Sequence, residues 1–207
     1  SYNYQMFSIK DTLWIMHPTG GWYSVNGKEW IKSALTDIVN NNAFLDYVWF
    51  NNALYGLGTF NGNIEKHTFT SAVHKTSDMR HWQVVAAKSN LPARFFYHPF
   101  VFNNKIWIIG GSDDKESFAD AWSSTDGINW NKEADNLPFG KRENSQAIIF
   151  KGNIYLLNSD VWSSPDGLHW TRETENVMPG NEIFGYASVV YDDQIWLQGC
   201  NRNRSEE

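Results

Sequence analysis

The sequence predicts an all-β fold made of repeated four-stranded antiparallel sheets. Three observations support this prediction. Two kinds of hairpin-like segment alternate along the chain, no 3.6-residue apolar period separates them, and aromatic residues form 16% of the 207 residues, with 11 tryptophans. A chain of this composition buries aromatic rings between sheets, so we expect strands throughout.

The first kind of segment is a β-rich run, a polar two-residue turn and a second run that contains an aromatic residue. Five copies are present, starting at Phe7, Val48, Phe100, Ile148 and Val189. Their turns are Lys10-Asp11, Asn51-Asn52, Asn103-Asn104, Lys151-Gly152 and Asp192-Asp193. Residues of these types tolerate the positive φ that tight hairpin turns require. Each copy therefore predicts an antiparallel hairpin.

The second kind of segment follows four of the five copies and ends in tryptophan. Its sequences are GWYSVNGKEW, HKTSDMRHW, AWSSTDGINW and VWSSPDGLHW, which close at Trp30, Trp82, Trp130 and Trp170. Asn-Gly or Asp-Gly in three of them is a strong hairpin signal. Because these tryptophans hold one place in the repeat, we interpret them as packing between sheets, in preference to exposed platforms for sugar stacking.

The spacing of the closing tryptophans predicts the architecture. They recur after 52, 48 and 40 residues, which matches a four-stranded blade of a β-propeller. We predict a single propeller domain over residues 1–207, with blades at about 4–42, 43–94, 95–142 and 143–182, a half blade at 183–200 and a tail at 201–207. About four and a half blades leave two main explanations open: the chain is part of a larger ring, or a partner chain supplies the missing sheet edge. A free-standing ring of four irregular blades is less favoured.

Composition excludes several classes of partner and cofactor. The net charge is -6, from 17 basic and 23 acidic residues without a block of either sign, which argues against a nucleic-acid partner. No apolar stretch reaches the length of about 18 residues that membrane insertion requires. One cysteine excludes an intrachain disulfide, and the 6 histidines show no metal-ligand spacing. We expect neither a metal nor another cofactor.

The run NNKIWIIGG, followed by Trp122 and then by DGINW, resembles the Kelch-repeat family, and most closely its bacterial galactose-oxidase-like branch. Gly110-Gly111 is the one full diglycine of the repeat. The resemblance implies a propeller whose blades bear arginine near the central channel. Galactose oxidase itself holds copper through Tyr and His ligands and has a Cys–Tyr thioether. No matching constellation can be assigned in this sequence, so we do not expect that activity.

The candidate ligand-binding residues lie in the segments that enter the first strand of each blade, where propellers usually bind. Aligning the blades puts Arg94 and Arg142 at the arginine position that the resemblance implies. An arginine-lined funnel could bind a carboxylate or an acidic sugar, although a structural role for each arginine, bonded to carbonyl groups and neighbouring blades, is the favoured interpretation. The other candidates on these segments are Tyr97, His98, Glu143, Tyr186 and Asp46.

The function that fits these observations is a non-catalytic binding or scaffold module, whose rim loops bind a protein or a glycan. No catalytic residue is assigned. The alternative is a carbohydrate-active enzyme similar to sialic-acid epimerases, with Arg94, Arg142, Tyr97, His98 and Glu143 around the funnel. An enzyme predicts that these side chains converge on one pocket with a perturbed pKa, whereas a scaffold predicts that they are dispersed. We expect a location outside the cytoplasm, either secreted, periplasmic or on the cell surface.

Overall fold

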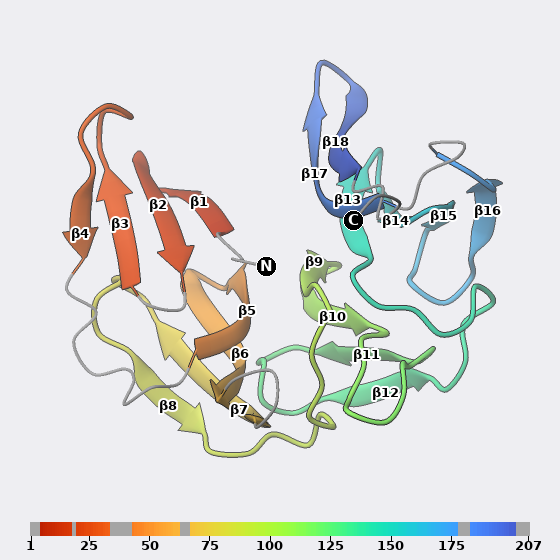
Figure 1. Ribbon diagram of the computed structural model, residues 1–207, viewed down its shortest axis with the longest axis horizontal. Helices are drawn as coiled ribbons and strands as arrows, with labels where there is room; N and C mark the ends of the chain where they lie inside the picture. Colours follow the sequence, from red (N-terminus) through yellow and green to blue (C-terminus); the bar gives the residue numbers. More distant parts are fainter. Residues whose placement is uncertain (1–4, 18–19, 34–42, 63–66, 178–182, 202–207) are drawn as a thin grey trace, which may run out of the picture. The chain divides into compact units, whose positions relative to one another are not determined.

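The computed structural model describes residues 5–17, 20–33, 43–62, 67–177 and 183–201, and the regular elements in these ranges are strands. The prediction of an all-β fold is confirmed. The chain divides into two compact units, Ser1–Ala93 and Arg94–Glu207, which are described separately. Figure 1 shows the strands in chain order.

The first unit contains two four-stranded antiparallel sheets, each a simple meander with the order β1-β2-β3-β4 or β5-β6-β7-β8. The first sheet consists of β1 (Gln5–Ile9), β2 (Thr12–His17), β3 (Gly20–Ser24) and β4 (Ile31–Ser33). The second consists of β5 (Ala43–Phe50), β6 (Ala53–Gly62), β7 (His67–Thr76) and β8 (Gln83–Ala86). Both sheets combine one predicted segment of each kind.

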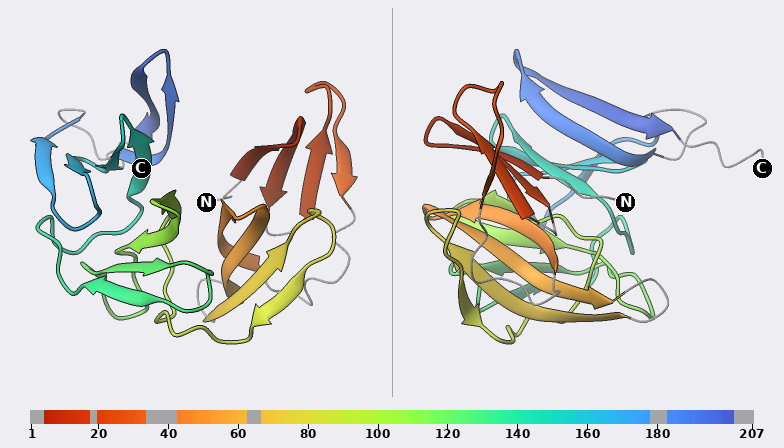
Figure 2. Two further views of the ribbon diagram at one scale, coloured as in Figure 1. Left: turned by 180° about the vertical axis from the view of Figure 1, so that it is seen from behind. Right: turned by 60° about the vertical axis from the view of Figure 1, so that its left-hand side comes forward.

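The second unit contains two further four-stranded meanders and a two-stranded sheet. The first meander has β9 (Phe100–Phe102), β10 (Lys105–Ile109), β11 (Ala121–Ser124) and β12 (Asn131–Ala134). The second has β13 (Gln146–Phe150), β14 (Asn153–Leu157), β15 (Val161–Ser164) and β16 (Thr171–Thr174). The last sheet pairs β17 (Ile183–Tyr191) with β18 (Gln194–Asn201), and β17 contacts β13. Figure 2 shows this last hairpin from two further sides.

The turns of the first segment type are the tight turns that the sequence predicts. Both turn residues have positive φ in all five hairpins, from 48° and 58° at Lys10 and Asp11 to 51° and 55° at Asp192 and Asp193. Lysine, aspartate and asparagine pay a small steric penalty there, and the strand twist favours this geometry over the common turn types. Local sequence alone therefore sets the register of each hairpin.

The turns of the second segment type differ from the predicted tight hairpins. Strand β11 ends at Ser124 and β12 begins only at Asn131, so the loop is wider than two residues. Ser124 Oγ accepts a hydrogen bond from Gly127 N (2.8 Å), and Asp126 Oδ1 accepts from the backbone N of Ile128 and Asn129 (2.8 and 2.7 Å). Side-chain oxygens thus close the loop by mimicking backbone turns. The Asp166 loop repeats these bonds.

In each unit, aromatic and aliphatic side chains fill the space between consecutive sheets. The leading face of a sheet is defined here as the face that packs on the next sheet in the chain, and the trailing face as its opposite. In the first unit, the leading face around Trp14 packs on the trailing face around Leu54 and Trp82. In the second unit, the leading face around Trp107 packs on the trailing face around Ile154. Sheets therefore hide their rings against their neighbours, as the repeat predicts.

The closing tryptophans bear out the predicted packing in three of four cases. Trp82 and Trp130 are buried, and Trp170 packs against the core of the second unit. The prediction is wrong for Trp30, which is 37% exposed. Trp30 follows β3, in the loop that leads to β4.

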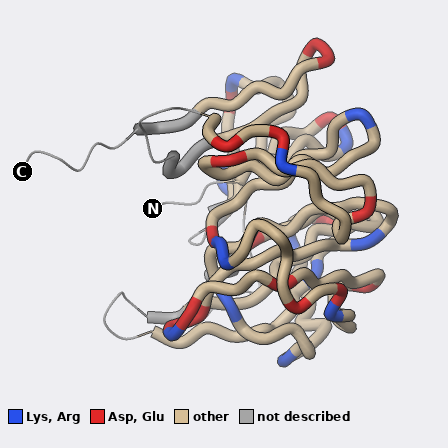
Figure 3. The backbone as a smooth tube through the Cα atoms, turned by 90° about the vertical axis from the view of Figure 1, so that its right-hand side faces the viewer, with Lys and Arg blue, Asp and Glu red and all other residues tan. Residues whose placement is uncertain are grey.

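Charged residues are spread along the strands and turns without a block of one sign (Figure 3). Among the described residues, no helix has the length and apolar character needed to cross a membrane.

Candidate functional site

Arg94, in the segment before β9, is fully enclosed by the protein. It is 1% exposed, and its Nη1 and Nη2 donate to Asp120 Oδ1 (2.6 Å) and Oδ2 (3.0 Å). Nη1 also donates to the carbonyl oxygen of Gly110 (2.9 Å), and the guanidinium carbon lies 4.3 Å from the ring centroid of Phe118. A two-pronged ion pair of this kind is strong and fixes both partners in orientation.

Arg142 repeats the arrangement one sheet further on. Its Nη1 donates to Asp160 Oδ1 (3.1 Å) and its Nη2 to the carbonyl oxygen of Phe139 (3.0 Å), with the guanidinium carbon 4.1 Å from the Phe139 ring centroid. Each aspartate lies two residues before a tryptophan of the third strand. Trp122 Nε1 and Trp162 Nε1 donate to Oδ2 of their aspartates, both at 2.7 Å. The Arg–Asp–Trp unit therefore recurs in two sheets.

The second of these aspartates is held in its charged form. Burial raises the pKa of Asp160, but hydrogen bonds from Trp162 and Arg142 and the positive charges of Arg142 and Arg172 outweigh burial and leave the pKa below its usual value. Arg142 therefore faces a permanent anion at neutral pH. The pair of Arg142 and Asp160 connects the loop before β13 to the start of β15.

Glycines 110 and 111 bring the predicted loops together. Both have positive φ, 64° and 89°; a Cβ on Gly110 would overlap the carbonyl oxygen of Arg142, and one on Gly111 would lie 2.9 Å from that of Phe95. Only glycine allows backbones to approach so closely. Gly111 N donates to the Arg142 carbonyl (2.9 Å), and Arg142 N donates to the Phe118 carbonyl (3.0 Å). The loops before β9 and β13 thus meet over the end of β10.

The accessible part of this junction is named the loop surface, and it consists of Phe96, Glu143 and Asn144. Phe96 is 50% exposed, and Phe96 and Asn144 both have φ of 56°. Asn144 N donates to the Phe96 carbonyl (2.8 Å), which links the two strained residues directly. Glu143 Oε2 accepts from Ser112 Oγ (2.6 Å). These hydrogen bonds hold Phe96, Glu143 and Asn144 at one junction of the two loops.

The other predicted residues of the second unit lie around this surface. Tyr97 is buried, with its Cβ beside Gly111. His98 is half-buried in the same segment. The structure therefore brings Arg94, Tyr97, Arg142 and Glu143 into one network of loops, in which both arginines bind aspartates of their own sheets.

Asp46 and Tyr186 are placed differently. Asp46 belongs to the first unit and is 2% exposed on β5. Its Oδ1 accepts from Tyr47 N (2.7 Å) and from Gln5 Nε2. Burial, and then the charge of Asp46, raises the pKa of the Tyr47 hydroxyl far above its usual value. Tyr186 lies on β17, and its side chain is outside the described residues.

Sequence reasoning missed Asp120, Asp160, Phe96 and Asn144. The first two carry a visible signal, because Asp-Ala-Trp-Ser-Ser and Asp-Val-Trp-Ser-Ser occupy the same place in two repeats. The positive φ of Phe96 has no local signal, since phenylalanine is not a turn residue. In the part of the chain described, no group of three His, Cys, Asp or Glu side chains is placed to hold a metal ion.

Comparison with known proteins identifies related domains. A family model described as the DUF6242 beta propeller domain matches residues 76–196. The solved structure titled "Structure of YjhT" superposes with a TM-score of 0.74 at 14% sequence identity, covering 95% of this chain and 71% of that chain. At this identity, the likeness shows the fold alone. No curated protein matches the sequence.

Proposed function

The chain belongs to the DUF6242 beta propeller domain family. We propose that it is a non-catalytic binding module, and that the loops before β9 and β13 bind its ligand. The ligand is a protein or a glycan, and the composition of the loop surface favours a glycan. We also propose that the repeats are Kelch-like. The diglycine that follows β10 supports this.

The observation that carries the proposal is the conformation of Phe96. A bulky residue with φ of 56° is a backbone outlier, and such strain costs on the order of 1–3 kcal/mol. Three backbone hydrogen bonds hold it in place: Phe95 pairs with Ser112 in both directions (2.8 and 2.9 Å), and Asn144 N bonds Phe96 O (2.8 Å). The result is an aromatic ring presented half in solvent. Strain of this kind concentrates at ligand-binding sites.

The neighbours of Phe96 suit a sugar ring. An aromatic face can cover the apolar C–H groups of a sugar, while carboxylate and amide oxygens accept hydrogen bonds from its hydroxyl groups and an amide nitrogen donates to them. Glu143 and Asn144 carry groups of these kinds, on the loop that bonds to the Phe96 backbone. The surface needs no metal and no general acid for this role.

The arginines support a binding role over the epimerase-like alternative. Gripping an acidic sugar requires a guanidinium group with free donors. Arg94 directs its Nη atoms to Asp120 and Gly110, and Arg142 directs its Nη atoms to Asp160 and Phe139. Releasing either arginine would leave a buried or half-buried aspartate uncompensated.

A glycan array probed with the wild-type chain and with Phe96→Ala tests the proposal. We expect the wild type to bind a limited set of glycans and Phe96→Ala to lose at least about tenfold in affinity, as loss of an aromatic contact does. Val84→Ala removes another exposed apolar side chain, on β8, and serves as the matched control. A Phe96→Ala variant that binds like the wild type would exclude the loop surface as the site, and an array without binding would exclude a glycan.

A further inference from the structure

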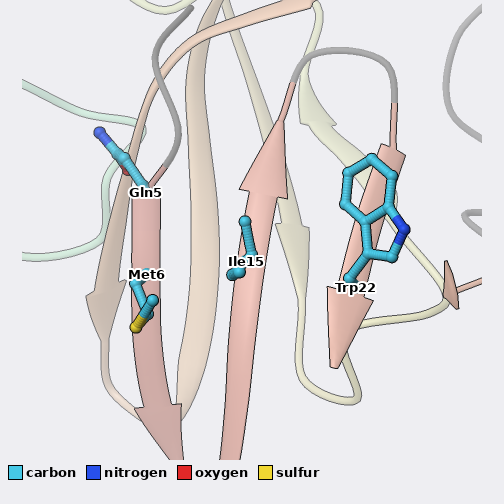
Figure 4. Close-up of a pocket in the computed structure, with 4 residues that line it drawn as sticks. All are labelled: Gln5, Met6, Ile15 and Trp22. Atoms are coloured by element: carbon cyan, nitrogen blue, oxygen red, sulfur yellow. The ribbon is translucent and has the colours of Figure 1, made fainter. Parts of the chain in front are cut away.

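The loop that joins β3 to β4 contains one of the two Asn-Gly dipeptides of the sequence. Strand β3, which carries the Trp22 side chain drawn in Figure 4, ends at Ser24, and β4 begins at Ile31. Asn26 and Gly27 lie between them. In an Asn-Gly pair, the glycine nitrogen can attack the side-chain amide carbon of the asparagine with little steric hindrance, because glycine has no Cβ. This loop is therefore a candidate for a reaction within its own chain.

The side-chain oxygen of Asn26 accepts hydrogen bonds from three donors. The backbone N of Lys28 and that of Glu29 donate to Oδ1, both at 2.9 Å, and Ser24 Oγ donates to it at 3.2 Å. An attack on the amide carbon would place negative charge on this oxygen. Donors already aimed at an oxygen that gains charge stabilise the transition state, as an oxyanion hole does in acyl transfer. The loop thus polarises the Asn26 amide.

Ser24 also contacts the attacking nitrogen. Gly27 N donates to Ser24 Oγ (2.9 Å), while the Ser24 hydroxyl donates to Asn26 Oδ1. One hydroxyl group therefore bonds both the nucleophile and the group that it attacks. In this position it can take the proton of Gly27 N and pass its own proton to Oδ1 as the new bond forms, which is acid–base catalysis by a positioned group. Ser24 is 1% exposed, so its hydroxyl is held in this arrangement.

The same loop occurs twice in the second unit with an unreactive side chain. Asp126 and Asp166 stand at the place of Asn26, and their Oδ1 atoms accept from the same two backbone positions at 2.7–2.8 Å. An ionised carboxylate resists attack because it already carries negative charge. The hydrogen bonds that only close the loop at Asp126 and Asp166 therefore activate the side chain at Asn26.

The residue three places after Asn26 agrees with this orientation of the amide. In the Asp126 loop, this place holds Asn129, which donates to the second carboxylate oxygen, Oδ2 (2.7 Å). The loop of Asn26 has Glu29 there, and an ionised carboxylate accepts hydrogen bonds but cannot donate them. An acceptor suits the NH2 group of Asn26, which leaves the amide oxygen to the three donors.

We propose that Asn26 is deamidated by its own loop in the folded protein, with Ser24 transferring the proton. Gly27 N bonds to Asn26 Cγ and closes a succinimide ring. The Cγ–Nδ2 bond breaks, and Nδ2 leaves as ammonia together with the proton that Gly27 N has lost. Water then opens the ring and leaves aspartate or isoaspartate at position 26. This inference does not depend on the proposed ligand.

Peptide mass spectrometry of the chain after incubation at neutral pH tests the inference. Exchange of NH2 for OH raises the mass of the peptide that contains Asn26, and the rate of this gain is compared between the folded chain and the chain unfolded in guanidinium chloride. We expect the folded chain to react at least about tenfold faster, because only the folded loop supplies the donors and the proton transfer. An equal or slower rate in the folded chain overturns the inference.

The second Asn-Gly pair is a control within the same molecule. Asn61 and Gly62 pair with Thr68 and His67 between β6 and β7, so the same dipeptide lies there in extended backbone. Its reaction should be no faster in the folded chain than in the unfolded chain. Acceleration at both pairs would show that the loop of Asn26 is not its source, and would overturn the inference.

Variants of Ser24 separate catalysis from shielding. Ser24→Ala should slow the reaction of the folded chain by at least about tenfold, whereas a loop that only shielded Asn26 would loosen and react faster, so a faster Ser24→Ala variant overturns the inference. Ser24→Thr is the matched control and should react like the wild type, because Thr76 Oγ1 bonds Met79 N (3.0 Å) and Asp78 Oδ1 (3.1 Å) in the same way. If circular dichroism shows that Ser24→Ala is unfolded, the comparison of folded and unfolded wild type decides.

Discussion

Arg94 and Asp120 face each other through two hydrogen bonds of 2.6 and 3.0 Å, although 26 residues separate them in the chain. The pair ties the segment before β9 to the start of β11, because Arg94 precedes β9 and Asp120 precedes β11. Arg142 and Asp160 do the same for β13–β16. The recurrence indicates a repeated structural device that holds the loop surface on rigid sheets.

Replacing Arg94 by alanine should destabilise the chain strongly. The substitution leaves the buried carboxylate of Asp120 without its counter-ion, and removing one partner of a buried pair costs about 3–5 kcal/mol. Lys141→Ala is the control, because Lys141 is 59% exposed in its pair with Glu116 and such pairs contribute about 0–1 kcal/mol. Urea unfolding followed by circular dichroism measures both. If both variants lost the same free energy of unfolding, the Asp120 carboxylate would not need Arg94 as its counter-ion.

Gly110→Ala and Gly140→Ala should differ although both glycines have positive φ, 64° and 74°. Alanine at either position meets the backbone penalty of about 1 kcal/mol. At Gly110, the new Cβ also overlaps the Arg142 carbonyl, whereas at Gly140 nothing lies within 4 Å. We expect the thermal midpoint to fall much further for Gly110→Ala. Similar thermal midpoints for the two variants would show that the contact between Gly110 and the Arg142 carbonyl oxygen does not require glycine.

The Asp126 loop should lose its contribution to stability in acid. Burial raises the pKa of Asp126, but hydrogen bonds from Asn129, Ile128 and Ser124 lower it by more, to about 2 against the usual 3.8. Since the folded pKa is depressed, the stabilisation is complete above pH 3.8 and is lost as the pH falls toward 2.

Unfolding midpoints of the wild type and Asp126→Asn across this acid range test the prediction. The difference between the two proteins should be constant above pH 3.8 and should shrink below it. Asp135→Asn, at a side chain that is 79% exposed, is the control. A difference that is independent of pH would contradict the role of the ionised carboxylate.

Phe96→Gly should be more stable than Phe96→Ala, which reverses the usual order of these residues. Glycine adopts a φ of 56° without strain, whereas alanine keeps a penalty of about 1 kcal/mol. The greater freedom of glycine in the unfolded chain offsets part of this gain. Urea unfolding midpoints decide the order. If Phe96→Ala were the more stable variant, Phe96 would not be strained in the native state.

The hairpins, their turns and the repeat could be predicted from the sequence because they depend on neighbouring residues. Asn103-Asn104 and Asp192-Asp193 favour positive φ by themselves, and their flanking strands need only a partner a few residues away. The aspartate loops were predicted as turns but with the wrong geometry, because dipeptide signals do not show that Ser124 and Asp126 side chains close them.

The sequence by itself determined that this chain forms paired hairpins that hide aromatic rings between sheets. Only the tertiary structure decided what Arg94 and Arg142 bind, that Phe96 is held in a strained conformation, and that Trp30 is more exposed than Trp82 and Trp130. The physical reason is the separation along the chain over which each kind of interaction acts. Turn and strand preferences act over a few residues, whereas burial and charge pairing depend on which distant segments the sheets bring into contact.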